Sequence, residues 1–209
     1  MTQLNSQSLA AAGQRGAHLP AYDRQSLTPS VVHIGLGAFH RAHQAMVFDA
    51  LLAKGDRRWG VLGVAMRSTQ LADALKAQNG LYAVQIASVK GIHWQIPGAL
   101  VDTCVLAREE ATVIQAIAAP GTRWITLTVT EKGYTPELAQ LLVQGLALRH
   151  QQRLSGLTIA SCDNLSHNGK RLQATCVAAA QALSAELANW VDQVCVFPNS
   201  MVDRIVPAA

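Results

Sequence analysis

Charged and aromatic residues are scarce in this sequence: 14% of its 209 residues are charged and 5% are aromatic. No apolar run approaches the roughly 18 residues that cross a bilayer, and the polar N-terminus does not resemble a signal peptide. We therefore expect no membrane segment and no export. The four cysteines include no C-x-x-C pair and no zinc-ligand spacing, which predicts reduced thiols, a cytoplasmic location and no metal site.

A clustered basic surface is also missing, although the formal net charge is +4. The basic residues are scattered along the chain, and the only adjacent pairs are Arg57-Arg58 and Lys170-Arg171. Binding to a phosphate backbone needs a clustered basic face, and base stacking needs aromatic side chains. We therefore expect no nucleic-acid partner.

What the sequence does contain is a regular alternation of apolar segments, with hydrophobic residues making up 50% of the chain. The expected strands are residues 31–34, 60–65, 124–129, 157–160 and 194–197. The expected helices are residues 40–54, 69–78, 107–118, 136–153 and 169–190, and residues 81–96 are expected to form a hairpin. This order predicts an α/β fold with a doubly wound, mostly parallel sheet of the Rossmann type and a small inserted hairpin.

Residues 1–29 show no sustained periodicity and are expected to form an extended N-terminal arm, which leaves residues 30–209 as one domain. Directly after the first expected strand comes Gly35-Leu36-Gly37. Two glycines allow a tight turn and a close approach to a pyrophosphate, which would make this a dinucleotide-binding domain. The third glycine of the usual motif is replaced by His40, so an ordinary glycine turn is the alternative. His40 and Arg41 start a helix, where cations are unfavourable unless an anion binds.

The second expected strand is followed by Met66, Arg67 and Ser68, with no acidic residue to hold the adenosine ribose of NAD. Arg67 suits the 2′-phosphate of NADP, and a solvent-facing loop arginine is the alternative. A Rossmann-type methyltransferase would also fit the glycine turn, but it usually carries an acid at this position.

Polar residues follow the remaining strands. Glu131 and Lys132 come after residues 124–129, Asn164 after residues 157–160, and Asp203 and Arg204 after the last strand. Because parallel strands end at one edge of a sheet, we expect one shared cleft. The alternatives are an ion-paired surface turn, a helix cap by Asp163 or Asn164, and an internal salt bridge.

Several segments together resemble the long-chain mannitol dehydrogenase family, which includes mannitol 2-dehydrogenase, D-arabinitol dehydrogenase and fructuronate reductase. They are LPAYDR (19–24), VVHIGLGAFHRAHQA (31–45), TVTEKGY (128–134), SCDN (161–164) and FPNSMVDRIVP (197–207). TEKGY and MVDRIVPAA are most similar to the fructuronate reductase branch. The resemblance implies an N-terminal Rossmann domain followed by a helical domain that carries a catalytic lysine. The family's K-x-x-x-x-N-x-x-H segment does not occur, so we expect this chain to hold the cofactor half without the C-terminal catalytic domain.

The resemblance and the positions after the strands together give the expected roles of single residues. Asn164 would lie beside the reacting carbonyl and Glu131 would be a cleft carboxylate, both supporting catalysis. The expected substrate-binding residues are Asp203, Lys132 and Arg204. The expected cofactor-binding residues are Ile34, Gly35, Gly37, Ala38, Phe39, His40, Arg41, Arg67 and Thr130.

The implied activity is hydride transfer between NAD, or alternatively NADP, and a ketose or keto-sugar acid of the fructose or fructuronate type. Without the lysine domain we expect the chain by itself to be inactive. The alternative is a nucleotide-binding module without catalysis, truncated or dependent on a separate partner chain. An apolar face that a second domain covers in the family would favour self-association.

Overall fold

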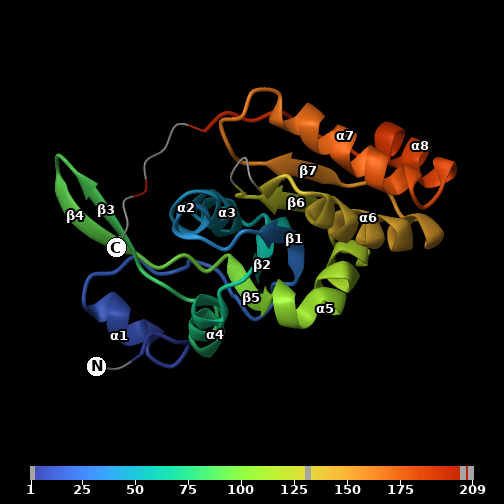
Figure 1. Ribbon diagram of the computed structural model, residues 1–209. Coiled ribbons are helices and arrows are strands. Elements are labelled where there is room, and N and C mark those ends of the chain that lie inside the picture. The colour runs from blue at the N-terminus through green and yellow to red at the C-terminus, as the bar shows by residue number, and fades with distance from the viewer. Residues whose placement is uncertain (1–2, 130–132, 203–205, 207–209) are drawn as a thin grey trace.

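The centre of the molecule is a five-stranded sheet (Figure 1). The computed structural model describes residues 3–129, 133–202 and 206. The strands are β1 (Pro29–Ile34), β2 (Gly60–Ala65), β5 (Leu100–Val105), β6 (Trp124–Leu127) and β7 (Thr158–Ser161). They lie side by side in the order β5-β2-β1-β6-β7, and every pairing is parallel. This arrangement confirms the predicted doubly wound Rossmann-type sheet.

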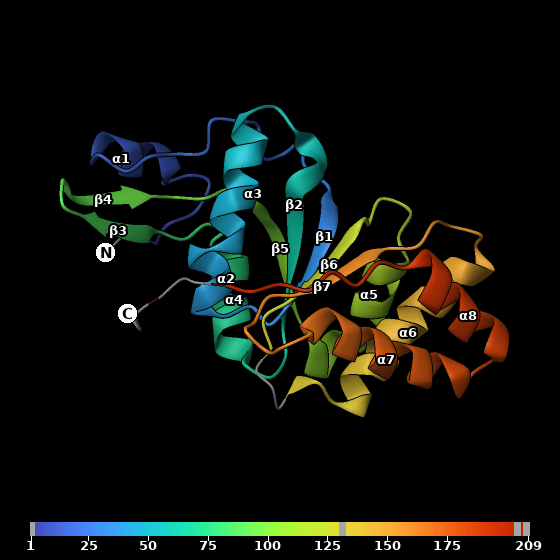
Figure 2. The ribbon, with the colours of Figure 1, turned by 90° about the horizontal axis from the view of Figure 1, so that it is seen from above.

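Helices cover both faces of the sheet (Figure 2). On one face lie α2 (Ala38–Ala42), α3 (Gln44–Ala53) and α4 (Thr69–Ala77). On the other lie α5 (Leu106–Ala118), α6 (Pro136–Gln151), α7 (Asn168–Gln181) and α8 (Ala185–Val194). Successive strand residues point to opposite faces, so Val31 joins the α3 side of the core and Val32 joins the α6 side. The mostly apolar character of the strands follows from this burial on both faces.

The inserted hairpin is also confirmed. Strands β3 (Val84–Ser88) and β4 (Gly91–Gln95) form a separate antiparallel pair that projects beside helix α1 (Leu9–Gln14), as Figure 2 shows. Helix α1 lies within the segment that was expected to be extended. That segment packs on the body of the protein, because Arg24 donates hydrogen bonds to the backbone oxygens of Asn79, Gly98 and Leu100.

Strand β5 was missed by the sequence analysis because Asp102 and Thr103 interrupt its apolar run. Asp102 is exposed at the edge of the sheet, and the hydroxyl of buried Thr103 is satisfied by the backbone oxygen of Ala72. Both polar side chains are therefore compatible with a strand. The expected strand 194–197 was wrong: α8 extends to Val194, and Val196 makes a single bridge to Thr158.

Two helices that were expected to be continuous are broken. Helix 40–54 divides into α2 and α3 at His43, whose φ and ψ of −127° and −82° are not helical. Helix 169–190 divides into α7 and α8, and Ser184 caps α8 by accepting a hydrogen bond of 3.0 Å from the Leu187 amide. Over the described ranges, no helix combines the length and apolarity that crossing a membrane requires.

Candidate functional site

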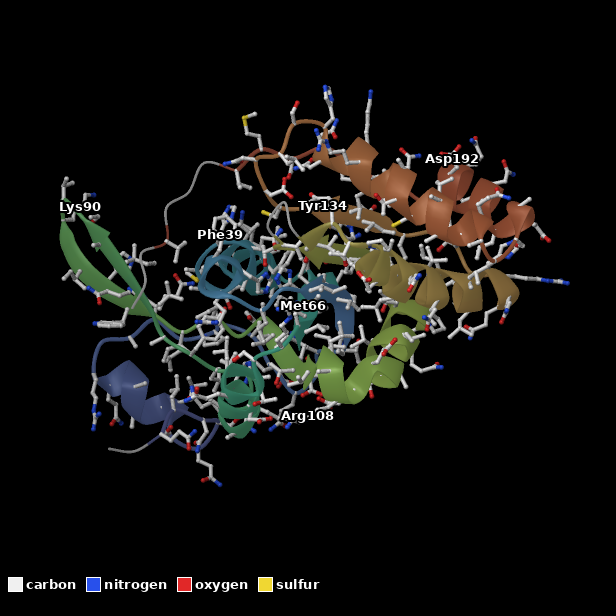
Figure 3. The ribbon with its side chains drawn as sticks, in the orientation of Figure 1. Phe39, Met66, Lys90, Arg108, Tyr134 and Asp192 are labelled. Atoms are coloured by element: carbon white, nitrogen blue, oxygen red, sulfur yellow. The ribbon has the colours of Figure 1, made fainter. Side chains whose placement is uncertain are left out.

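The carboxyl ends of β1 and β6 mark the point where the strand order reverses, because the chain continues from β1 to β2 on one side and returns to β6 on the other. In open α/β sheets, ligands bind in the crevice at this point. The turn Gly35–Gly37 leaves β1 here, and Thr128 leaves β6 beside it. In Figure 3, Phe39, Met66 and Tyr134 label the segments that follow β1, β2 and β6.

The glycine turn is tightly fixed by its neighbours. Gly35 has φ of +105°, and a Cβ atom at this position would lie 2.6 Å from the backbone oxygen of Thr128. The amides of Gly35 and Leu36 donate to the Val64 oxygen on β2, at 3.0 and 3.2 Å. Gly37 is exposed and precedes α2, and a Cβ atom there would make only an ordinary contact of 3.7 Å with the Gly35 oxygen. Only glycine fits at position 35. The outer side of the turn is exposed, so a pyrophosphate could approach its backbone closely.

Two buried histidines lie beneath this turn. His33 Nδ1 is 2.8 Å from the Thr126 hydroxyl, and His33 Nε2 is 3.1 Å from both the Gly35 oxygen and the Thr128 hydroxyl. The His40 ring stacks on His33 with ring centroids 3.4 Å apart. Burial lowers the pKa of His33 well below its ordinary value, and burial lowers the pKa of His40 to about 4. Both rings are therefore neutral at pH 7.

The other expected cofactor-binding residues surround the turn. Ala38 is exposed, and Phe39 is half-buried with its ring against His43. Arg41 is half-buried over the Tyr82 ring, and burial lowers the pKa of its guanidinium, which stays protonated at neutral pH. The side chain of Ile34 is fully buried in the core, so only its backbone can meet a ligand.

Arg67 is exposed immediately after β2, next to Ser68, which precedes α4. Its position at the carboxyl end of β2 is the one that the sequence analysis expected. Thr130, Glu131, Lys132, Asp203 and Arg204 lie outside the described residues, and their expected roles remain predictions.

A hydrogen-bond network follows β7 around Asp163. The Tyr134 hydroxyl donates to the Asp163 carboxylate, as do Ser161 Oγ at 2.8 Å and Asn168 Nδ2 at 2.8 Å. Burial raises the pKa of Asp163, but the hydrogen bonds from Tyr134, Asn168, Ser161 and the Leu165 amide outweigh it, and the net pKa is below its usual range. Asp163 is therefore a charged anchor that joins the segment after β6 to the segment after β7.

The segment 197–202 crosses the carboxyl edge of the sheet and is held by two asparagines. Asn168 is fully buried and accepts a hydrogen bond from the Ser200 amide at 2.9 Å. Asn164 is exposed, and its Oδ1 accepts a hydrogen bond from the Val202 amide at 2.7 Å. This contact uses the Asn164 oxygen and leaves its NH₂ group as the part that can meet a ligand.

The alternative role of Asp163 or Asn164, a cap on the next helix, is not the one the structure gives them. Helix α7 begins at Asn168, and the residue before it, His167, is in the left-handed region with φ of 57°. The Asp163 carboxylate accepts instead from the Leu165 amide and from three side chains. Asp163 and Asn164 lie four or more residues before the first residue of α7, so neither is at the position that caps it.

Sequence reasoning did not find His33, Thr126, Thr128, Asn168 and Ser200 as parts of this site. A signal for the first two was present, because each is a polar residue inside an apolar strand. His33 on β1 and Thr126 on β6 are partners in the register of the two strands. Two polar residues at one level of neighbouring buried strands satisfy each other.

A parallel sheet of this order, with a glycine turn at its reversal point, defines the Rossmann class of nucleotide-binding folds. Residues 29–209 match the mannitol dehydrogenase Rossmann domain. The chain belongs to the mannitol dehydrogenase family.

Curated relatives are identical to this chain at about a third of the aligned positions. The chain is 36% identical to a mannitol 2-dehydrogenase of Cereibacter sphaeroides, over 93% of this chain and 46% of that protein. It is 33% identical to a D-mannonate oxidoreductase of Escherichia coli, over 91% of this chain and 45% of that protein. The chain thus spans about half the length of these relatives.

Solved structures agree with this assignment. Mannitol 2-dehydrogenase of Pseudomonas fluorescens, in a ternary complex with NAD and D-mannitol, matches 99% of this chain with a TM-score of 0.89 and 30% identity. A substrate-free D-sorbitol dehydrogenase matches with a TM-score of 0.90 and 28% identity. In both cases the match covers 48% of the solved chain.

Proposed function

We propose that this chain is the nicotinamide-cofactor-binding part of an oxidoreductase that acts on a polyol or sugar acid. One observation carries the proposal: Gly35, with φ of +105° against Thr128, forms a turn at the reversal point of the sheet. A dinucleotide needs this backbone shape in this place. The similar Pseudomonas fluorescens enzyme was solved with NAD and D-mannitol, which supports the same ligand classes here.

The residues of the turn fit a dinucleotide in shape and charge. Gly37 leaves the outer side of the turn open, and the half-buried Arg41 supplies positive charge directly after it. When bound, the nicotinamide supplies or takes up the hydride. The chain's own task is to bind and orient the cofactor and to form one wall of the substrate cleft.

Among the residues that the structure describes, Asn164 is assigned a role in substrate chemistry. Its oxygen is occupied by the Val202 amide, so the NH₂ group is the donor that can meet a carbonyl oxygen of a ketose or keto-sugar acid. We assign Glu131 a supporting role in catalysis, Thr130 a cofactor contact, and Lys132, Asp203 and Arg204 substrate contacts. Turnover needs the half of the related enzymes that lies outside the matched region. The chain alone should therefore be inactive.

NAD is the proposed cofactor, and Arg67 makes NADP the second candidate because it is exposed at the carboxyl end of β2. The free cysteines fit a reducing compartment, and we place the protein in the cytoplasm.

A fluorescence titration with NADH and NADPH in parallel tests the proposed function, with the four tryptophans as reporters. We expect saturable binding of at least one cofactor. If Arg67 holds a 2′-phosphate, Arg67→Ala weakens NADPH binding and leaves NADH binding unchanged. Arg15→Ala, another exposed arginine, is the matched control. Binding of S-adenosylmethionine alone would instead identify a methyltransferase.

A further inference from the structure

Two stacked histidines lie beneath the glycine turn: His33 has no part in the function proposed so far, and His40, expected to bind the cofactor, is buried. His33 belongs to β1 and is fully buried, whereas His40 comes from α2 and is 1% exposed. The rings are nearly parallel, with an interplanar angle of 12°. His33 also joins β1 to β6, because one ring nitrogen contacts Thr126 and the other contacts Thr128 and the Gly35 oxygen. The pair therefore links the turn to both central strands.

The hydrogen bonds fix the position of the proton on His33. The Thr128 hydroxyl has one proton, and it donates that proton to the Gly35 oxygen at 2.6 Å. His33 Nε2 contacts the same carbonyl oxygen and the Thr128 oxygen, so both of its neighbours are acceptors and Nε2 must donate. In the neutral ring, Nδ1 is then an acceptor, and the Thr126 hydroxyl donates to it at 2.8 Å.

The same reasoning applies to His40. Its Nδ1 is 3.1 Å from the amide oxygen of Gln44, so Nδ1 carries the proton. Its Nε2 is then a buried acceptor, and no residue in the described part of the chain hydrogen-bonds to it. An unsatisfied buried acceptor costs free energy. The ring is kept in this position at that cost, flat against His33.

The Gly35 oxygen is the atom on which this network converges. It accepts from Thr128 Oγ1 at 2.6 Å, from His33 Nε2 at 3.1 Å and from the Gly37 amide at 2.6 Å. Three donors on one carbonyl oxygen hold the Gly35–Leu36 peptide in one orientation. This orientation sets the direction of the backbone from Gly35 to Ala38, the stretch that a dinucleotide would approach.

We propose that His33, as the Nε2-protonated tautomer, and the His40 ring stacked on it form a positioning pair for cofactor binding. The pair holds the Gly35 carbonyl inward and so shapes the turn before the cofactor arrives. His33 touches the turn and not the reacting atoms, so it is a positioning residue. The inference rests on the proposed function, because the turn is assigned to a dinucleotide there.

NADH titrations of the full 209-residue chain test the role of the pair. His33→Leu removes the donor, and we expect NADH affinity to fall by roughly tenfold, the effect of losing one buried hydrogen bond. His33→Gln can place an N–H near the position of Nε2 and should recover most of the affinity. Equal affinity of His33→Leu and the unchanged protein, with native circular dichroism in both, overturns the proposal.

A second pair of variants decides the matter if His33→Leu does not fold. Thr126→Val removes the hydroxyl that donates to His33 Nδ1, and Thr103→Val removes an equally buried hydroxyl on β5 that donates to the Ala72 oxygen. Both lose one buried hydrogen bond. The proposal is supported if NADH binding weakens in Thr126→Val and not in Thr103→Val. Equal effects of the two variants on NADH binding overturn it.

Nuclear magnetic resonance separates this inference from the proposed function. Long-range proton–nitrogen correlations of the cofactor-free protein should show the Nε2-protonated tautomer of His33 and the Nδ1-protonated tautomer of His40. A Nδ1-protonated His33 overturns the assignment whether or not NADH binds. Failure of the unchanged protein to bind NADH, with the expected tautomers present, would refute the proposed function and leave the assigned hydrogen-bond network intact.

Discussion

Two groups of side chains near the carboxyl edge of the sheet have opposite charge states, although burial disfavours the charged form in both. His33 and His40 are neutral, because burial disfavours the imidazolium and their hydrogen-bond partners are hydroxyls, amides and backbone oxygens. Asp163 is charged, because donors from Tyr134, Asn168 and Ser161 outweigh its burial. Hydrogen-bond donors thus keep Asp163 ionised, whereas burial keeps the two histidines neutral.

The histidine pair should make the protein less stable in mild acid. In the unfolded chain a histidine takes up a proton near pH 6.5, whereas folded His40 does so at about pH 4. Between these values the unfolded state binds more protons, so the free energy of unfolding falls as pH falls, by about 1.4 kcal/mol per pH unit for each histidine. Asp163, with a lowered pKa, adds a further loss only in stronger acid.

Urea unfolding across this pH range measures the effect. His40→Gln should give a shallower dependence than the unchanged protein, because one of the two buried imidazoles is removed. His93→Gln is the control, since His93 is exposed on the hairpin. A slope that His40→Gln and His93→Gln alter equally would contradict the assignment of the acid sensitivity to the buried pair.

Helices α5 and α6 are joined by a buried arginine instead of by apolar packing alone. Arg149, near the end of α6, is 1% exposed and donates to backbone oxygens of Ile117, Ala119 and Ser155. The Ile117 and Ala119 oxygens lie at the C-terminal end of α5, where carbonyl groups lack partners within the helix, and Ser155 lies in the loop that follows α6. One side chain thus ties the end of α5 to the loop that follows α6.

Replacing this arginine with lysine should weaken the joint while the positive charge is retained. Lysine has a single ammonium group and does not reproduce the planar fork of the guanidinium, so at least one carbonyl loses its donor. We expect Arg149→Lys to lower the free energy of unfolding by about 1–3 kcal/mol. Arg15→Lys, at an exposed position, should have almost no effect in the same urea titration. Equal stabilities of the two variants would argue against the structural role of Arg149.

Across the whole molecule, one sheet separates two apolar cores. Leu142 on α6 and Leu52 on α3 are each fully buried, one in each core. Strands β1, β2 and β5 place buried side chains in both cores, so neither layer of helices keeps its packing if the sheet is lost. The two layers should therefore unfold together.

Truncation in either core tests this coupling. Leu142→Ala and Leu52→Ala should each lower the free energy of unfolding by about 2–5 kcal/mol, and each should still unfold in a single transition. Leu183→Ala is the control, because Leu183 lies between α7 and α8 and is 61% exposed. Two separate transitions in either core variant, seen by comparing circular dichroism with tryptophan fluorescence, would show that the layers are independent.

Local patterns in the sequence were sufficient for most of the fold. Apolar runs flanked by glycine and proline identified β1, β2, β6 and β7, because strands buried on both faces must be apolar. The same patterns failed for β5, where an edge position tolerates Asp102, and at residues 194–197, where one bridge replaced a strand. Edge exposure and isolated bridges depend on neighbours that a local window does not contain.

The sequence by itself determined the fold class, the glycine turn after β1 and the family resemblance, since all three depend on residues that are close together in the chain. Only the tertiary structure decided how the site is supported. His33 meets Thr126 across 93 residues, and Asn164 meets Val202 across 38 residues. Such contacts are set by strand order and register, and the low polarity of the core then forces the buried polar groups to pair with whatever donor or acceptor the fold brings beside them.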